Sequence, residues 1–317
     1  MAKRVALIRR PVSQPRAEDD YLAAIIERLE PELILERLPT EDRDMASLRT
    51  MDAVLVFWPY RWLLDAPPLG FGSLNGRTVM LEHDGFGDFT WWFGLQGTWA
   101  TTFRRHGFDL MVVSGARSLA HFENSGIDTA LVHKGASLDR FHDLAQQRSG
   151  FCTFGTDYTS RLIMQRKLRR ARLKVSRIAP EYSELNDQLN QFAAMVTTMR
   201  GTQVRFGSLG RVGERLRRGT FVLQESAPEP MMKVFEGAAA GCAVVTDSVV
   251  DLPALGFVDG ENIITFDDLD QCVEKVRHYA RYRDDLERIG AAAAALVERR
   301  HSWRQRAAYL EAAIFPT

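Results

Sequence analysis

Cysteine is scarce in this 317-residue sequence, and long apolar runs are missing. The three cysteines, Cys152, Cys242 and Cys272, have spacings that fit neither a disulfide framework nor a zinc site. Such usage is typical of a reducing compartment, and we expect all three thiols to be chemically inert. The first apolar run, residues 5–8, is too short for a secretion signal or a membrane span. We therefore expect a cytoplasmic protein with no transmembrane segment.

Net charge is lacking as well, because 41 lysines and arginines balance 41 aspartates and glutamates. A strong field over the whole chain that would attract nucleic acid or membrane is excluded, so any such partner must bind a local patch. The sequence has no Gly-Lys-Ser/Thr phosphate loop, and Gly207, Gly210 and Gly213 do not form a dinucleotide-binding fingerprint. Hydrophobic residues make up 45% of the chain, which is enough for sizeable cores and excludes disorder as a global class.

The first half of the chain alternates short apolar runs with segments of helical spacing. The runs are residues 5–8, 53–57, 78–81, 110–113 and 129–132. They end in polar or glycine-rich loops, as strands buried on both faces do. Residues 21–29 and 118–124 have the spacing of helices. The pattern predicts an α/β domain with a mostly parallel sheet over residues 1–142.

The same pattern starts again after a polar segment, residues 143–150, which we interpret as a linker. The predicted strands are residues 151–154, 221–224, 243–246 and 263–266, and the predicted helices are residues 160–171, 231–240, 269–279, 291–297 and 305–313. They indicate a second α/β domain over residues 151–317, whose last helix could pack back on the first domain. Ligands of such domains bind at the carboxyl ends of the strands, so we expect the site where the two domains face each other.

One segment, residues 229–247, has the composition of a helix start that binds an anion. Pro230 suits a first helical turn. The amides of Met231, Met232 and Lys233, together with the helix dipole, favour a diphosphate at this point. The small residues 237–241 allow the helix to lie close to the strand that follows.

This segment resembles the donor-binding stretch of group 1, family 4-like glycosyltransferases with the GT-B fold, and it is most similar to their spore-maturation branch. Residues 132–141 resemble the turn that closes the N-terminal domain in that family, and residues 257–303 follow its pattern too. The resemblance implies a GT-B fold with two Rossmann-like domains facing across a cleft. It also implies a retaining transferase that takes a nucleotide diphosphate sugar as co-substrate, with no further cofactor, and it implies that Glu236 reaches the ribose.

The sequence departs from the family at one position. In the best-known members a first glutamate stands eight residues before the second and contacts the donor sugar, whereas this chain has Pro228 there. Glu229 lies one residue later and Glu225 three residues earlier. We keep Glu229, with Met231 and Met232, as a donor-binding candidate. A catalytically inactive protein that retained the fold is an alternative hypothesis.

A second group of candidates, His83 and Asp84, follows the predicted strand at residues 78–81. In the family a histidine near this place contacts the donor sugar, and an aspartate often follows it. Either residue could orient the sugar or the acceptor hydroxyl, since both can accept a proton or a hydrogen bond near neutral pH. The alternative interpretation is a loop histidine held by a local carboxylate.

Two cations are further catalytic candidates. The resemblance puts Gly155 and Thr156 in the loop near the diphosphate. Arg161, at the start of the following helix, could neutralise it, because a guanidinium pairs with two phosphate oxygens at once. Lys233 is the second cation of this site. A surface arginine at a helix start is the alternative for Arg161.

Two features suggest other partners. Residues 166–177 contain no acidic residue, as in segments that bind phosphate backbones or anionic lipids, although the interleaved leucines also fit a solvated amphipathic helix. Trp91 and Trp92 belong to an aromatic-rich stretch that could stack on a sugar ring, so we expect them to bind the acceptor, a small molecule or a glycan. DNA is a possible alternative acceptor, bound through residues 166–177, with a modified base as the target.

Two Asp-x-Asp patterns, residues 42–44 and 268–270, could suggest a metal that binds the nucleotide sugar. The second pattern stands where acids are expected at a helix start, and the first lies in an acidic loop. We therefore predict no metal site and a metal-independent reaction.

Overall fold

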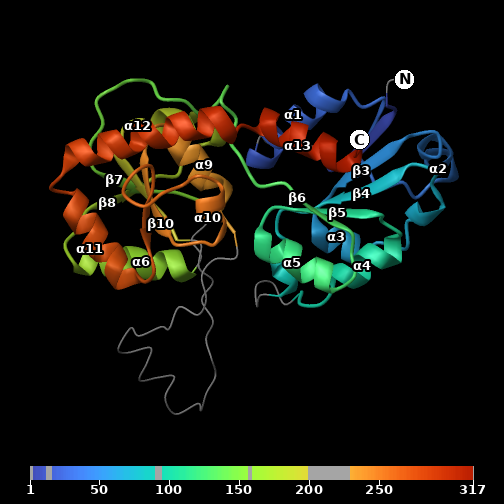
Figure 1. Ribbon diagram of the computed structural model, residues 1–317, viewed down its shortest axis with the longest axis horizontal. Coiled ribbons are helices and arrows are strands. Elements are labelled where there is room, and N and C mark those ends of the chain that lie inside the picture. The colour runs from blue at the N-terminus through green and yellow to red at the C-terminus, as the bar shows by residue number, and fades with distance from the viewer. Residues whose placement is uncertain (1–2, 12–15, 90–94, 156–158, 199–228, 317) are drawn as a thin grey trace, which may run out of the picture. The chain divides into compact units, whose positions relative to one another are not determined.

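The computed structural model describes residues 3–11, 16–89, 95–155, 159–198 and 229–316. The chain divides into two compact units (Figure 1). Unit 1 comprises Met1–Ser137 with Arg300–Thr317, and unit 2 comprises Leu138–Arg299. The predicted linker at residues 143–150 therefore lies within unit 2, and the last helix belongs with unit 1.

Unit 1 contains a six-stranded parallel sheet in the order β2-β1-β3-β4-β5-β6. The strands are β1 (Val5–Arg9), β2 (Leu33–Leu35), β3 (Ala53–Phe57), β4 (Arg77–Leu81), β5 (Leu110–Val113) and β6 (Thr129–Leu131). All five strands predicted in this half are confirmed. The apolar residues of the central strands are buried because helices cover both faces of the sheet, as parallel sheets require. The short strand β2 was not predicted.

Helices cover the two faces of this sheet. They are α1 (Ala17–Leu29), α2 (Asp42–Leu48), α3 (Tyr60–Asp65), α4 (Trp99–His106), α5 (Ala116–Asn124) and α13 (Trp303–Ile314), with short 3-10 turns η1 (Phe71–Ser73) and η2 (Gly85–Asp88). Figure 1 shows α1 and α13 on one side of the sheet and α4 and α5 on the other. The helix α13 starts with a capping box, in which the side chains of Ser302 and Gln305 bond to each other's backbone amides. It packs along α1, and the rings of Tyr21 and Trp303 lie 4.6 Å apart.

Unit 2 contains a five-stranded parallel sheet in the order β11-β10-β9-β7-β8. The strands are β7 (Phe151–Thr153), β8 (Val175–Arg177), β9 (Ala194–Val196), β10 (Ala243–Asp247) and β11 (Ile264–Phe266). Three predicted strands are confirmed as β7, β10 and β11. The strand predicted at residues 221–224 lies outside the described residues, and β8 and β9 were not predicted.

The helices of unit 2 pack on this sheet around a core that includes Met164, Leu168 and Val276. They are α6 (Thr159–Arg170), α7 (Leu185–Leu189), α9 (Met232–Ala239), α10 (Asp251–Ala254), α11 (Leu269–Tyr279) and α12 (Arg283–Arg300), with the 3-10 turn η3 (Tyr182–Glu184). The predicted helices at residues 160–171, 231–240 and 269–279 are confirmed as α6, α9 and α11. The helices α6 and α11 directly follow the strands β7 and β11, and α9 directly precedes β10.

Each sheet has a point where the order of its strands reverses. In unit 1 the strand β1 lies between β2 and β3, and in unit 2 the strand β7 lies between β8 and β9. Ligands of open α/β sheets bind outside the carboxyl ends of the strands at such points, because the neighbouring loops diverge there. The fold therefore points to the loops after β1 and β3 in unit 1 and after β7 and β9 in unit 2.

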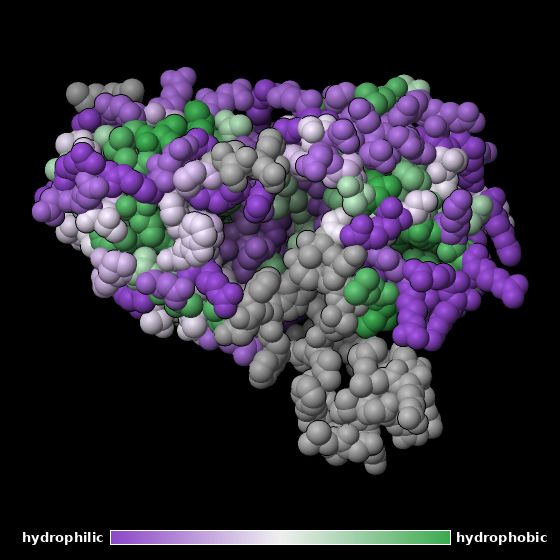
Figure 2. All heavy atoms as spheres, turned by 180° about the vertical axis from the view of Figure 1, so that it is seen from behind, coloured by the Kyte–Doolittle hydropathy of each residue, from purple (hydrophilic) through white to green (hydrophobic). Residues whose placement is uncertain are grey.

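The coloured residues of the face shown in Figure 2 are mainly hydrophilic, with separate hydrophobic patches among them. Among the helices that the structure describes, none combines the length and the apolar character needed to cross a membrane.

Candidate functional site

Two cations meet at Gly155, directly after β7. Gly155 has a φ of +89°, in the left-handed region that favours glycine. A Cβ atom at this position would lie 2.6 Å from Lys233 Nζ and 3.4 Å from Arg161 Nη1, so the backbone turn leaves both cations facing its open side. The Arg161 side chain is almost fully buried, and Lys233 Nζ donates to the carbonyl oxygen of Phe154 at 3.4 Å. The structure thus brings together three predicted site residues that are separated by up to 78 positions in the sequence.

The electrostatic state of Lys233 differs from that of an ordinary lysine. The pKa of Lys233 is lowered to about 7, mainly by burial and also by the neighbouring Arg161 guanidinium, while Glu236 opposes the shift. Two cations held so close together repel each other and lack the hydration that would stabilise them. An anion bound beside them would relieve both costs.

The start of α9 contributes backbone groups to the same place. The helix begins at Met232, and Met231 before it is extended and provides no side-chain cap. The first amides of a helix lack partners within the helix, and the helix dipole gives that end a partial positive charge. Lys233 belongs to this first turn, so the predicted combination of helix start and lysine is present in the fold.

Glu236 lies one turn further along α9 and is buried, with an exposed fraction of 4%. Its Oε1 accepts a hydrogen bond of 3.2 Å from the Tyr182 hydroxyl, which comes from η3. The resemblance implied that Glu236 reaches the ribose, and the described residues bury its side chain. The ring of Tyr182 lies 5.7 Å from that of Phe141 and 4.7 Å from the Arg140 guanidinium. Tyr182 was missed from the sequence, since no motif marks it.

Other polar groups lie at the carboxyl ends of β9 and β10. The Thr198 hydroxyl donates to Asp247 Oδ1 at 2.9 Å, and Asp247 is fully buried at the end of β10. Glu229, the predicted donor-binding residue before α9, is buried with an exposed fraction of 1%. The sequence signal that could have singled out Asp247 is an acidic residue at the end of a short apolar run.

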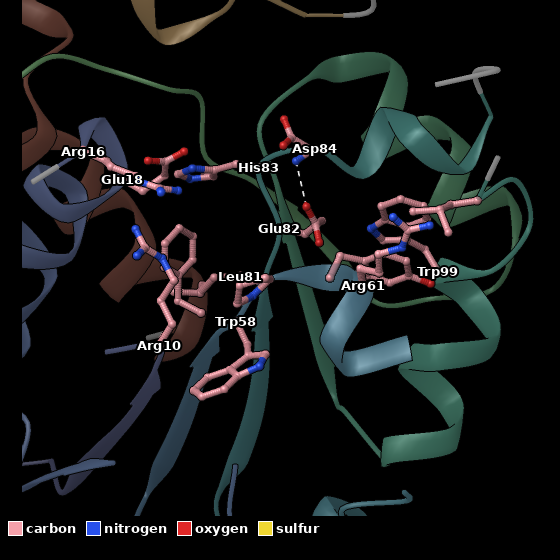
Figure 3. Close-up of a pocket in the computed structure, with 14 residues that line it drawn as sticks. Arg10, Arg16, Glu18, Trp58, Arg61, Leu81, Glu82, His83, Asp84 and Trp99 are labelled. Atoms are coloured by element: carbon pink, nitrogen blue, oxygen red, sulfur yellow. Dashed lines mark hydrogen bonds between the residues drawn. The ribbon is translucent and has the colours of Figure 1, made fainter. Parts of the chain in front are cut away.

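In unit 1 a pocket of about 330 Å³ lies at the carboxyl ends of β1, β3 and β4 (Figure 3). Its lining includes both His83 and Asp84, which follow β4 as the sequence predicted. The pocket lies at the point where the strand order of this sheet reverses, which is the expected place for a ligand.

His83 is held in a stack of aromatic rings. Its imidazole is stacked on Tyr21 at 4.8 Å and on Trp303 at 5.9 Å, and it meets the edge of Phe57 at 5.4 Å. Burial lowers the pKa of His83 to about 3, and the nearby Lys134 lowers it too. A pKa this low argues against proton uptake by His83 near neutral pH, and its role as a hydrogen-bonding residue of the site stays a prediction. A neutral imidazole can still donate or accept a hydrogen bond.

Asp84 differs from its neighbour because its carboxylate is mostly exposed. Asp84 Oδ1 lies 3.9 Å from Lys134 Nζ, and the Lys134 side chain is buried against the ring of Phe86 at 5.7 Å. Lys134 and Trp303 were not predicted, because their contacts join segments that are far apart in the chain.

The remaining predictions have different outcomes. Thr156, Trp91 and Trp92 lie outside the described residues. The basic segment at residues 166–177 covers the end of α6, a turn and β8. Its Lys167 pairs with Asp270 at 2.7 Å, whereas Arg166, Arg169 and Arg170 are exposed.

The Asp-x-Asp pattern at residues 268–270 forms a helix cap. Asp268 Oδ1 accepts hydrogen bonds of 2.8 Å from the amides of Asp270 and Gln271, so the predicted helix start is confirmed. Among the residues with a described placement, no group of three or more metal-binding side chains is found.

Comparison with known proteins addresses the family and the fold. Residues 161–312 match a family model described as "Glycosyl transferase-like". No curated protein sequence matches the chain. Several solved structures resemble it over nearly its whole length. Sucrose-phosphate synthase from Thermosynechococcus elongatus has a TM-score of 0.66 at 10% identity, covering 98% of this chain and 97% of that chain.

The second is HepE from Anabaena in complex with UDP, with a TM-score of 0.62 at 10% identity, covering 97% of this chain and 98% of that chain. The third is the lipopolysaccharide outer core galactosyltransferase WaaB, with a TM-score of 0.60 at 11% identity, covering 98% and 99%. The chain has the GT-B fold. The predicted fold class is confirmed, and the GT-B fold accounts for two α/β units, each with its own parallel sheet. Similarity to the spore-maturation branch stays a prediction.

Proposed function

We propose that this protein is a glycosyltransferase that binds a nucleotide diphosphate sugar in unit 2. The observation that carries the proposal is the meeting of Arg161, Lys233 and the start of α9 beside Gly155. The match of residues 161–312 to the glycosyl transferase-like model supports it, since this stretch contains all of these groups except Gly155. HepE was solved with UDP and with UDP-glucose, which makes UDP-sugars the first donors to test.

The two cations stabilise the leaving group. When the bond between the anomeric carbon and the diphosphate breaks, negative charge grows on the phosphate oxygens. Arg161, Lys233 and the first amides of α9 face this charge from a partly desolvated position, where fixed charges and dipoles are most effective. The removal of one such group typically slows a reaction about 10²- to 10³-fold.

Glu236 binds the ribose. Its Oε1 already accepts one hydrogen bond from Tyr182, and a carboxylate has room for further donors such as ribose hydroxyls. Gly155 lets the diphosphate approach the backbone closely, because any larger residue would place its Cβ between the two cations. In the same proposal Glu229, Met231 and Met232 remain donor-binding residues, Met231 and Met232 through the backbone. A retaining outcome rests on the family resemblance of residues 229–247 alone.

The acceptor binds to unit 1, in the pocket at the ends of β1, β3 and β4. His83 acts there as a neutral hydrogen-bonding group, because its pKa of about 3 keeps the imidazole uncharged at physiological pH. The exposed carboxylate of Asp84 is available to a hydroxyl group in the same pocket. DNA is not proposed as the acceptor, because 41 basic residues balance 41 acidic residues and the chain has no net charge that would attract a polyanion.

The test is a panel of nucleotide sugars, namely UDP-glucose, UDP-galactose, UDP-N-acetylglucosamine and GDP-mannose. We expect at least one to raise the melting temperature, since a ligand at 100 times its Kd adds about 2.7 kcal/mol to the free energy of unfolding. We also expect slow release of the nucleoside diphosphate by transfer to water. Stabilisation without any release, even with added acceptors, would favour the catalytically inactive alternative. The absence of both effects would contradict the proposal.

A further inference from the structure

The pocket of unit 1 has charged groups around an aromatic wall. Figure 3 shows Leu81 and Glu82 at its centre, with Arg10 and Arg16 on one side and Arg61 and Trp99 on the other. Among the described residues, three arginines and three acids line it, so their formal charges cancel. The charge that a ligand would face depends on which of these groups already form ion pairs or hydrogen bonds within the protein.

The acids of the pocket all have favourable surroundings. Glu82 Oε1 accepts a hydrogen bond of 2.7 Å from the Asp84 amide, so it is turned back to its own loop. Asp84 faces the buried ammonium of Lys134 at 3.9 Å. Glu18 belongs to the first turn of α1, where the helix dipole stabilises a negative charge.

Two of the arginines lack such partners. Arg10 pairs with Asp19 at 3.5 Å, outside the pocket lining. The guanidinium groups of Arg16 and Arg61 form no ion pair with any residue that the structure describes, and both side chains are exposed. Within the described part of the chain, the pocket therefore keeps two positive charges without an ion pair at its rim, while its acids are compensated.

The rest of the lining suits a sugar ring. Tyr60 and Trp99 are stacked with ring centroids 3.5 Å apart, and the Tyr60 hydroxyl is bonded to Thr98 and Thr102 at 2.9 Å. These contacts hold the aromatic wall rigid. A volume of about 330 Å³ is at the small end of ligand pockets, so it suits a sugar of one ring or the end of a chain.

The buried ring nitrogens His83 Nδ1 and Trp99 Nε1 also find no hydrogen-bond partner among the described residues. Both belong to residues that line the pocket. Buried polar atoms of this kind are uncommon in folded proteins, and they are often explained by a ligand or water that is bound in the working state.

We propose that this pocket recognises an acceptor sugar that carries an anionic group, either a phosphate or a carboxylate, through Arg16 and Arg61. A guanidinium pairs with either group by two parallel hydrogen bonds, and at an exposed rim it loses little hydration before binding. The assignment of this ligand as the acceptor rests on the proposed glycosyltransferase function. The preference of the pocket for an anionic sugar does not.

The test measures binding by calorimetry to the full chain saturated with UDP. The probes are glucose 6-phosphate, galactose 6-phosphate and glucuronic acid, with the neutral hexoses and inorganic phosphate for comparison. We expect at least one charged sugar to bind at least tenfold more tightly than its neutral counterpart and than inorganic phosphate. The hexose phosphates and glucuronic acid separate a phosphate from a carboxylate as the preferred group.

The double variant Arg16→Gln/Arg61→Gln should remove this preference. Arg49→Gln is the matched control, because Arg49 is exposed in the same unit and has no ion pair with any described residue. A preference that persists in the double variant, or equal affinity for charged and neutral sugars in the unaltered protein, would overturn the inference. The affinities of UDP and GDP for the same proteins separate this failure from failure of the proposed function, which would appear as no binding of either nucleotide to the unaltered chain.

Discussion

At the scale of single residues, the proton on Lys233 controls the proposed donor site. Burial and the neighbouring Arg161 lower its pKa to about 7, so the free protein carries a mixture of charged and neutral lysine near neutral pH. A diphosphate favours the charged form, and its binding should draw a proton from solution. The affinity for UDP should therefore depend on pH in a range where an ordinary lysine is always charged.

We predict that UDP affinity falls as the pH rises from 7 to 9. Below the pKa the lysine is already protonated, and above it each binding event must first add a proton, so the loss is at most about tenfold per pH unit. Calorimetry in buffers of different ionisation enthalpy measures both the affinity and the proton uptake. Lys233→Arg should abolish the dependence, because a guanidinium stays charged. A dependence of the same size in Lys233→Arg would assign it to another group.

The sequence could predict candidates at this scale but not their environments. Arg161 and Lys233 each stand near the start of a helix next to a strand, so a parallel sheet was expected to bring them to the same edge. The neutral state of His83 depends on Tyr21 and Trp303, which are 62 residues before it and 220 after it, and no local pattern encodes such contacts. Tyr182 was missed for the same reason.

At the scale of secondary-structure elements, the longest apolar runs gave the clearest strand predictions. The strands β1, β3 and β10 each have five residues and were predicted because their runs are continuous and end in loops. Among the three-residue strands, β6, β7 and β11 were predicted and β2, β8 and β9 were missed. The outcome varies because strands this short depend largely on pairing with their neighbours in the sheet, which the local sequence does not show.

The cap of α11 gives a prediction at this scale. Asp268→Ala should lower the free energy of unfolding by about 1 kcal/mol, because it removes the acceptor for two helix amides. Urea denaturation measures this loss. Release of nucleoside diphosphate should be unchanged in the variant and should survive EDTA. Loss of activity with the chelator and recovery with Mg²⁺ or Mn²⁺ would show instead that the reaction needs a metal.

At the scale of the whole molecule, the return of the last helix to unit 1 is the main feature that the sequence left open. We predicted that residues 151–317 form the second domain and that the last helix could pack back on the first. In the structure, Arg300–Thr317 belongs to unit 1. A backbone bridge joins Ala136 to Ser302, and Arg306 Nε donates to the Lys134 carbonyl oxygen at 3.1 Å. These contacts join the two chain segments that make up unit 1.

Trp303→Ala should therefore destabilise unit 1 strongly. The indole is 3% exposed and contacts both Tyr21 and His83, and the truncation of a buried tryptophan costs about 3–5 kcal/mol. Chemical denaturation monitored by circular dichroism measures the loss. Tyr309→Ala is a suitable control, because Tyr309 is 54% exposed on the same helix and should cost far less. Equal losses in the two variants would show that the aromatic stack contributes little.

The central claim is that Arg161, Lys233 and the start of α9 bind a diphosphate. The most direct measurement compares the affinities of UDP and uridine for the unaltered chain, for Lys233→Met and for Lys275→Met, a control whose lysine pairs with Asp259 elsewhere in unit 2. We predict that UDP binds far more tightly than uridine. We also predict that Lys233→Met lowers UDP affinity by about tenfold to a hundredfold, the value of one hydrogen bond to a charged group. Uridine affinity should stay the same, as should both affinities in Lys275→Met. Equal binding of UDP and uridine, or an equal loss for both in Lys233→Met, would contradict the account.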